Sequence, residues 1–213
     1  MKNSLRVLRY NLAYLVRQQG WQLLASYAVA ATVSGFLNNT PILFFMAASQ
    51  AARIYEQQCL RGNGKLYGAL PLTHAQFLLG QYLYVGVVHA FSALVCLAHI
   101  GAYGGSMLDS VYLALVFFAT FTFIQAAYLP GYYRTGVANY NGAGTAYGLV
   151  ALAIFLVAII GALLWEPFAL HPAASSPVVI CLLLFIGGVA CLAVSYRYAA
   201  RNHPRGYVEP APK

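Results

Sequence analysis

The chain has 213 residues, of which 61% are hydrophobic and only 8% are charged, and its formal net charge is +8. A soluble domain carries about a quarter charged residues, so this composition excludes a water-soluble protein. It predicts an all-α integral membrane protein in which spans of about 20 residues leave no room for a separate soluble domain. The twelve Lys and Arg residues stand between apolar segments or near the chain ends, which indicates membrane topology rather than nucleic-acid binding.

Residues 1–20 have the pattern of a basic amphipathic helix. With about 3.6 residues per turn, Arg6 and Arg17 lie well away from the aliphatic face. That face collects Leu5, Leu8, Leu12, Leu15 and Val16. We expect this helix to lie in the membrane interface, the alternative being an extended start of the first span. Because arginines interrupt the apolar residues and no small-residue cleavage site follows, the segment does not resemble a cleavable signal peptide.

Six apolar segments follow within residues 21–200, and each is expected to span the membrane. They cover residues 21–37, 41–55, 75–100, 111–129, 145–165 and 178–196. All twelve cations then fall on the side that holds the termini, the loop after the second span and the loop after the fourth. Basic residues are retained in the cytoplasm, so both termini are expected there, with residues 201–213 as a cytoplasmic tail. The predicted location is a bacterial cell membrane.

A few polar side chains lie within the expected spans. Gln50, His89 and Gln125 either line a translocation path or mediate helix packing through interhelical hydrogen bonds. No span holds a deeply placed carboxylate, which argues against transport driven by a proton or sodium gradient. The four cysteines lack metal-ligand spacing, so no metal site is expected.

Catalytic and nucleotide-binding motifs are missing from the sequence. The run from Arg61 to Leu66 lacks the G-x-x-x-x-G-K spacing of a phosphate loop, and neither G-x-S-x-G nor H-E-x-x-H occurs. We therefore expect this chain to be no enzyme, with no catalytic residues and no bound cofactor.

The longest polar interruption covers residues 56–74, between the second and third spans. It carries two basic residues, Arg61 and Lys65, beside residues of the kind found in protein interiors. The latter are Leu66, Tyr67, Leu70 and Leu72. Apolar and aromatic anchors dominate most protein interfaces, so we predict that this loop docks a soluble partner. The alternative is a solvated loop whose charges only fix the topology.

Two motifs resemble those of type-2 ATP-binding-cassette exporter permeases. The first is Glu56, a short polar run and Leu70-Pro71-Leu72-Thr73 ahead of the third span. Members of that family commonly have a basic residue and a lysine where this chain has His74 and Gln81. The second motif, Leu129-Pro130-Gly131-Tyr132-Tyr133-Arg134, follows the fourth span. Compact members of the family also resemble this chain in having six spans and no large extracellular domain.

This resemblance implies a permease subunit that pairs with an identical or related permease. It also implies a separate cytoplasmic ATPase that binds the ATP and Mg. The loop is then expected to dock on that ATPase through Glu56, Arg61, Lys65, Leu66, Tyr67, Leu70, Pro71 and Thr73. A second cytoplasmic loop is expected to present Tyr132, Tyr133 and Arg134. The implied cargo is an amphipathic or hydrophobic peptide, toxin or drug. The alternative function is a stand-alone six-span carrier or membrane scaffold without ATP coupling.

Overall fold

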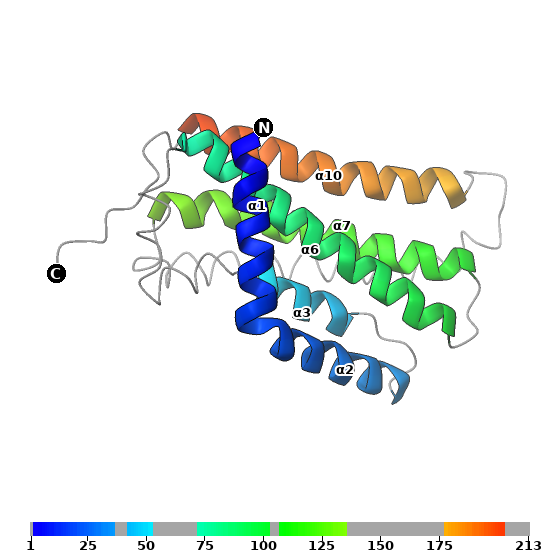
Figure 1. Ribbon diagram of the computed structural model, residues 1–213. Helices are drawn as coiled ribbons and strands as arrows, with labels where there is room; N and C mark the ends of the chain where they lie inside the picture. The colour runs from blue at the N-terminus through cyan, green and yellow to red at the C-terminus, as the bar shows by residue number, and fades with distance from the viewer. Residues whose placement is uncertain (1, 37–41, 53–71, 103–106, 136–176, 203–213) are drawn as a thin grey trace.

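The computed structural model describes residues 2–36, 42–52, 72–102, 107–135 and 177–202 (Figure 1). Every regular element in these ranges is helical, which confirms the predicted all-α class for this part of the chain. The elements are α1 (Lys2–Tyr14), the π-helix η1 (Leu15–Gln19), α2 (Gly20–Phe36), α3 (Ile42–Ala52), α6 (His74–Ala102), α7 (Met107–Thr135) and α10 (Pro177–Asn202).

The longer helices lie side by side, and α1 crosses them near one end of the bundle (Figure 1). We call this the α1 end. It also holds the start of α6 and the ends of α3, α7 and α10 (Figure 1). The chain runs from α1 into α2 without leaving the helical state, and it turns at η1. A π-helical turn inserts a residue into the hydrogen-bond ladder and is a known cause of helix kinks.

Three described helices are long and apolar enough to cross a membrane. They cover residues 74–102, 110–130 and 182–201. A bilayer core of about 30 Å needs about 20 helical residues. The described stretches of α2 and α3 contain 17 and 11 residues, and each stops where its described range stops. The fifth expected span, residues 145–165, lies outside the described ranges. The total of six spans therefore stays a prediction.

Helix α7 extends beyond the expected end of the fourth span. We expected that span to end at residue 129 and a loop to follow, but the helix continues through Pro130 to Thr135. Tyr132, Tyr133 and Arg134 therefore lie on helical backbone and not in a loop. Proline is tolerated inside a membrane helix when the carbonyl that it frees finds another hydrogen-bond donor.

The buried face of α1 matches the predicted leucine face only in part: Leu15 is buried, and Leu8 and Leu12 pack half-buried against the core. The buried row consists of Ser4, Val7, Asn11 and Leu15. Leu5 and Val16, both expected on the apolar face, are 45% and 71% exposed. The reason lies in the partner helix: a Cβ built on Gly80 of α6 would stand 2.5 Å from the Val7 Cβ. The missing side chain of Gly80 lets α1 approach α6 closely at Ser4 and Val7.

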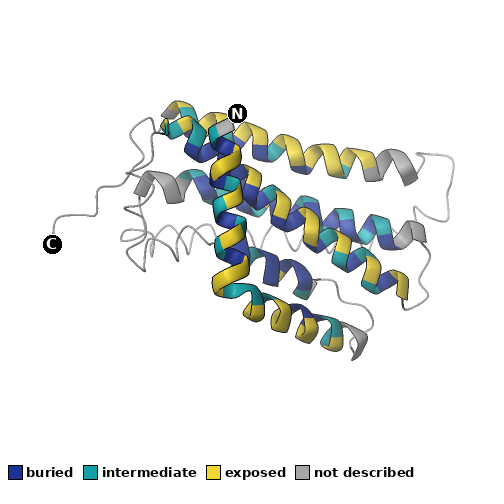
Figure 2. Ribbon diagram, in the orientation of Figure 1, coloured by how far each residue is buried: buried dark blue, intermediate teal, exposed yellow. Residues whose placement is uncertain are grey.

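Two large clusters of buried side chains form the core. Figure 2 shows the buried residues distributed along α3, α6 and α7. The first joins α1, α3, α6, α7 and α10 near the α1 end. The second joins α2, α3, α6 and α7, and it is rich in aromatic rings. In it, the rings of Phe45 and Phe121 stack with centroids 5.5 Å apart, and Tyr27 hydrogen-bonds Ser92. Helix α10 is the most exposed of the three candidate spans, with 17% of its apolar window buried.

Candidate partner-docking site at the α1 end

The start of α6 is closed by a reciprocal cap. The backbone N–H of Gln76 donates to Thr73 Oγ1 at 3.3 Å, and the backbone N–H of Thr73 donates to Gln76 Oε1 at 3.2 Å. The Phe77 N–H donates to the Thr73 carbonyl at 3.0 Å, which begins the helical ladder. The sequence Thr-His-Ala-Gln has the spacing of a capping box, in which each side chain satisfies an otherwise unpaired backbone N–H. Thr73 thus fixes where the predicted docking loop ends.

Two pairs of amide side chains fasten α1 to this start of α6. Asn3 Nδ2 donates to Gln76 Oε1 at 3.3 Å, and Asn11 Nδ2 donates to Gln81 Oε1 at 3.0 Å. Asn11 and Gln81 are 0% and 2% exposed, so the second pair is fully buried. Between the two pairs lies the Gly80 contact. Helix α1 and the cap of α6 therefore form one tightly joined unit, which we call the α1–α6 junction.

The end of α3 is also held on α6. Tyr84 Oη donates to the carbonyl of Ala51 at 2.8 Å, and both residues are buried. Ala51 is the last residue but one of α3, and the last four carbonyls of a helix have no partner within it. Residues 53–71 therefore connect the end of α3, which Tyr84 holds, to the start of α6, which Thr73 caps.

A third polar contact joins α6, α7 and α10 at the same end. Pro130 has no N–H, so the carbonyl of Ala126, four residues earlier, has no helical donor. Ser195 Oγ of α10 donates to that carbonyl, and the Tyr82 hydroxyl lies 2.8 Å from the same Ser195 Oγ. Since Ser195 uses its only proton on Ala126, Tyr82 is the donor in the second bond. The rings of Tyr82 and Tyr196 also meet edge to face, with centroids 5.8 Å apart.

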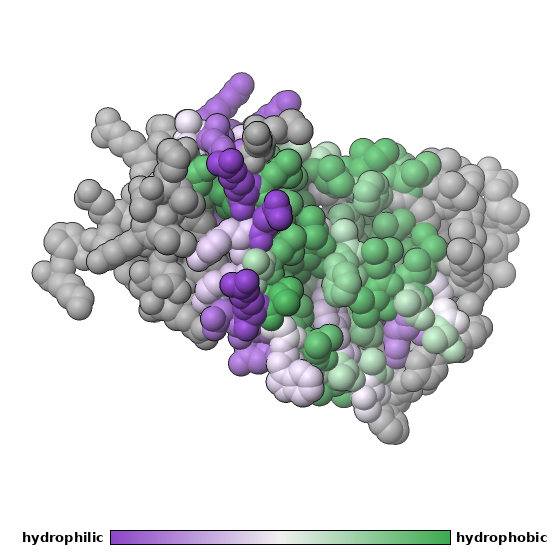
Figure 3. All heavy atoms as spheres, in the orientation of Figure 1, coloured by the Kyte–Doolittle hydropathy of each residue, from purple (hydrophilic) through white to green (hydrophobic). Residues whose placement is uncertain are grey.

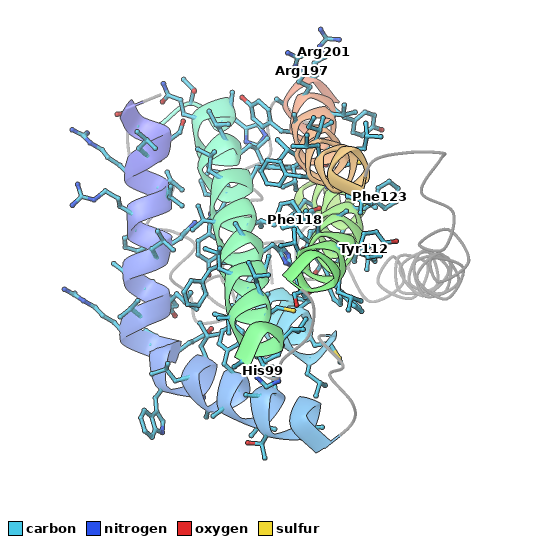
Figure 4. All side chains as sticks on the ribbon, turned by 90° about the vertical axis from the view of Figure 1, so that its right-hand side faces the viewer. His99, Tyr112, Phe118, Phe123, Arg197 and Arg201 are labelled. Carbon is cyan, nitrogen blue, oxygen red and sulfur yellow. The ribbon has the colours of Figure 1, made fainter. Side chains whose placement is uncertain are left out.

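Exposed cations gather at the α1 end. Arg6, Arg9 and Arg17 are exposed along α1 and η1, where Figure 3 shows the hydrophilic side chains beside a hydrophobic bundle. Arg197 and Arg201 extend from the last turns of α10 (Figure 4). This is the end at which the charge pattern predicts the cytoplasm.

The structure places only part of the predicted docking set. Thr73 is described and caps α6. The other members lie outside the described ranges: Glu56, Arg61, Lys65, Leu66, Tyr67, Leu70 and Pro71. The residues that position both loop ends were missed: Asn3, Asn11, Gln76, Gln81, Tyr84 and Ser195. Of these, only Gln76 had a sequence signal, because it completes the capping box with Thr73.

Three polar residues were expected either to line a translocation path or to mediate helix packing, and those whose side chains are described are buried. His89 is 0% exposed and Gln125 4% exposed, while Gln50 lies on α3 with its side chain undescribed. The His89 ring lies 6.4 Å from that of Phe121, and among the described residues neither of its nitrogens has a hydrogen-bond partner. Within the same ranges, no three His, Cys, Asp or Glu residues are placed to hold a metal ion.

The helices and their apolar surfaces define an integral membrane protein. A family model described as ABC-2 family transporter protein matches residues 10–202, which is most of the chain. The chain therefore belongs to the ABC-2 transporter family, as its motifs predicted, and it is a membrane component of a transport system. Neither a curated protein nor a solved structure matches it.

Proposed function

We propose that this chain is the permease subunit of an ATP-binding-cassette exporter and that residues 56–74 dock its ATPase subunit. The family match supports the transport role. The observation that carries the docking proposal is the fastening of both loop ends to one helix. Tyr84 holds the end of α3, and the cap of Thr73 and Gln76 holds the start of α6. A partner that moves the loop would therefore move α6.

The packing around α6 supports a route from the loop to the spans. Its first turns are bonded to α1 through Asn3 and Asn11. Tyr82, the residue after Gln81, bonds to Ser195 of α10, and Ser195 bonds to Ala126 of α7. Tyr84 adds the contact to α3. A displacement of α6 at this end is therefore expected to move α1, α3, α7 and α10 with it, because hydrogen bonds link these helices to α6 directly or through Ser195.

The proposed cycle needs two permease subunits and an ATPase that closes on ATP. Closure would pull the docking loops and shift the bundles between inward-facing and outward-facing arrangements. The described spans carry few charges, and α10 presents a broad apolar surface. An amphipathic or hydrophobic cargo, such as a peptide or a drug, fits such a bundle better than a strongly charged solute.

Co-purification with a candidate ATP-binding-cassette ATPase, sought first in the reading frames next to this gene, tests the docking proposal. The variant L66D/Y67D/L70D replaces three apolar anchors by carboxylates, and we expect it to lose most of the bound ATPase. Ala102→Asp, at the exposed far end of α6, is the matched control and should retain it. Equal recovery of the ATPase with both variants would contradict docking at residues 56–74.

Cargo is tested with the assembled complex in lipid vesicles. ATP hydrolysis should rise when an amphipathic peptide or a hydrophobic drug is exported, and a panel of both classes identifies the better substrate. Hydrolysis that responds to none of these compounds, but responds to a small charged solute, would overturn the proposed cargo class.

A further inference from the structure

We infer that the outer face of α1 and η1 is a binding surface for anionic lipid headgroups. The face has three exposed arginines, Arg6, Arg9 and Arg17. They lie on the side of the helix opposite the buried row of Ser4, Val7 and Asn11, so none is used in packing α1 on the bundle. We call these three residues the arginine face.

No acidic side chain of the described part lies beside the arginine face. The chain has four acidic residues, Glu56, Asp109, Glu166 and Glu209, and none belongs to α1, η1 or α2. Asp109 starts α7 at the end of the bundle away from α1 (Figure 1). The guanidinium groups therefore present a row of donors that an external anion can satisfy, and guanidinium binds phosphate through two parallel hydrogen bonds.

The flank of the same face is apolar. Leu5 and Val16 are 45% and 71% exposed, and Trp21, at the start of α2, is 83% exposed. A cation row beside exposed aliphatic and aromatic groups matches a boundary where phosphates meet acyl chains. Tryptophan favours the same depth, because its ring is amphipathic.

The orientation of α1 also favours a membrane surface. Helix α1 crosses the candidate spans near their ends instead of running along them (Figure 1). If the spans cross the bilayer, α1 lies in its plane, with the arginine face at headgroup depth. A second copy of this chain is a poorer occupant, because a symmetric contact through this face would set its three arginines against the same three arginines of the other copy.

Fluorescence quenching with brominated lipids tests this inference on the full chain without any ATPase. The only other tryptophan is Trp165, so W165F leaves Trp21 as the reporter, four residues from Arg17. Vesicles of phosphatidylcholine contain the same fraction of brominated phosphatidylglycerol or brominated phosphatidylcholine. We expect stronger quenching by the phosphatidylglycerol. Each arginine near such a surface is worth roughly fivefold in binding, so R17Q should lower this preference and R6Q/R9Q/R17Q should abolish it.

Two controls separate charge at this face from other causes. R197Q/R201Q removes two exposed cations at the same end of the bundle but on α10, and it should leave the preference unchanged. R6K/R9K/R17K keeps the charge and should retain most of it. Equal quenching by both lipids in the parent protein would overturn the inference, as would an equal loss in the α10 variant. Absence of quenching by either lipid would place Trp21 away from the acyl chains and overturn it as well.

Discussion

Helix α6 meets α1, and α7 meets α10, through a glycine in each case, but the two contacts are built differently. At the α1–α6 junction the helices cross once, and Gly80 admits the Val7 Cβ and the backbone oxygen of Ser4. Two amide pairs flank that crossing. Along α7 and α10 the helices run together for most of their length (Figure 1), and Gly188 meets the Thr122 hydroxyl and the Phe118 ring.

This difference assigns the two contacts different tasks. A single crossing with polar pairs on both sides fixes one short helix at one place, beside the end of the docking loop. A long parallel contact spreads its energy over many side chains, and no single one decides it. We therefore expect the α1–α6 junction to respond sharply to one substitution and the α7–α10 contact to respond weakly, except at Ser195.

Gly80→Ala should give the largest effect. The new Cβ would lie 2.5 Å from Val7 Cβ and 2.9 Å from the Ser4 carbonyl oxygen, and neither atom is the end of a flexible side chain. We expect a loss of about 2–3 kcal/mol in the free energy of unfolding, measured by denaturant titration in detergent micelles. Gly86→Ala on the same helix is the control, because its nearest neighbour, Leu192 Cδ1, is 3.8 Å away. Similar losses from the two variants would contradict the close crossing.

Ser195→Ala should cost about 2 kcal/mol in the same titration, because it leaves the Ala126 carbonyl and the Tyr82 hydroxyl unpaired. The cost should shrink in a Pro130→Ala background, since the restored N–H of residue 130 can reclaim the Ala126 carbonyl. Ser26→Ala removes only an exposed bond to the Gln22 carbonyl and should change little. If S195A costs the same with and without Pro130, Ser195 does not compensate for the proline.

Gly188→Ala should cost about 1 kcal/mol, less than the change at Gly80. Its Cβ would lie 2.8 Å from Thr122 Oγ1, 3.0 Å from an edge atom of the Phe118 ring and 3.3 Å from the Ala119 Cα. The two nearest atoms belong to side chains, which yield more easily than the backbone. Gly187→Ala has no atom within 4 Å and serves as the control in thermal unfolding. A loss at Gly188 that exceeds the loss at Gly80 would reverse the comparison.

Asn11→Leu should have the smallest effect of the four. A hydrogen bond between membrane helices contributes about 0.6 kcal/mol on average, and Gln81 loses its Asn11 donor in this variant. The double variant N11L/Q81L should cost less than the sum of the two single changes, because no amide is then left unpaired. Additive costs in that double-mutant cycle would show that the amide pair is not coupled.

Much of the fold could be predicted from composition and charge, for physical reasons. The apolar segments predicted the starts of α6 and α10 to within one residue. They could do so because a helix that crosses a bilayer needs about 20 apolar residues. The capping box at Thr73 is local in sequence, so its spacing alone reveals it. The family also followed from short motifs at the right places, and the match over residues 10–202 confirms it.

The contacts between helices could not be predicted in the same way. Hydropathy placed the leucines of α1 on its packing face, but the packing row is set by Gly80, which is far away in sequence. Ser195 bonds across separations of 69 and 113 residues, and its partner carbonyl is free only because Pro130 lies within a helix. A single sequence shows the proline, but it does not show which serine donates to the carbonyl that the proline leaves unpaired.

Contact between residues 56–74 and an ATPase can be measured by site-specific photo-crosslinking. A photoreactive residue replaces Tyr67 in one variant and Ala102 in another, each expressed with the ATPase identified by co-purification. We predict a crosslinked product of permease and ATPase from position 67 only. A product from position 102, or none from position 67 in a complex that still co-purifies, would contradict the docking site.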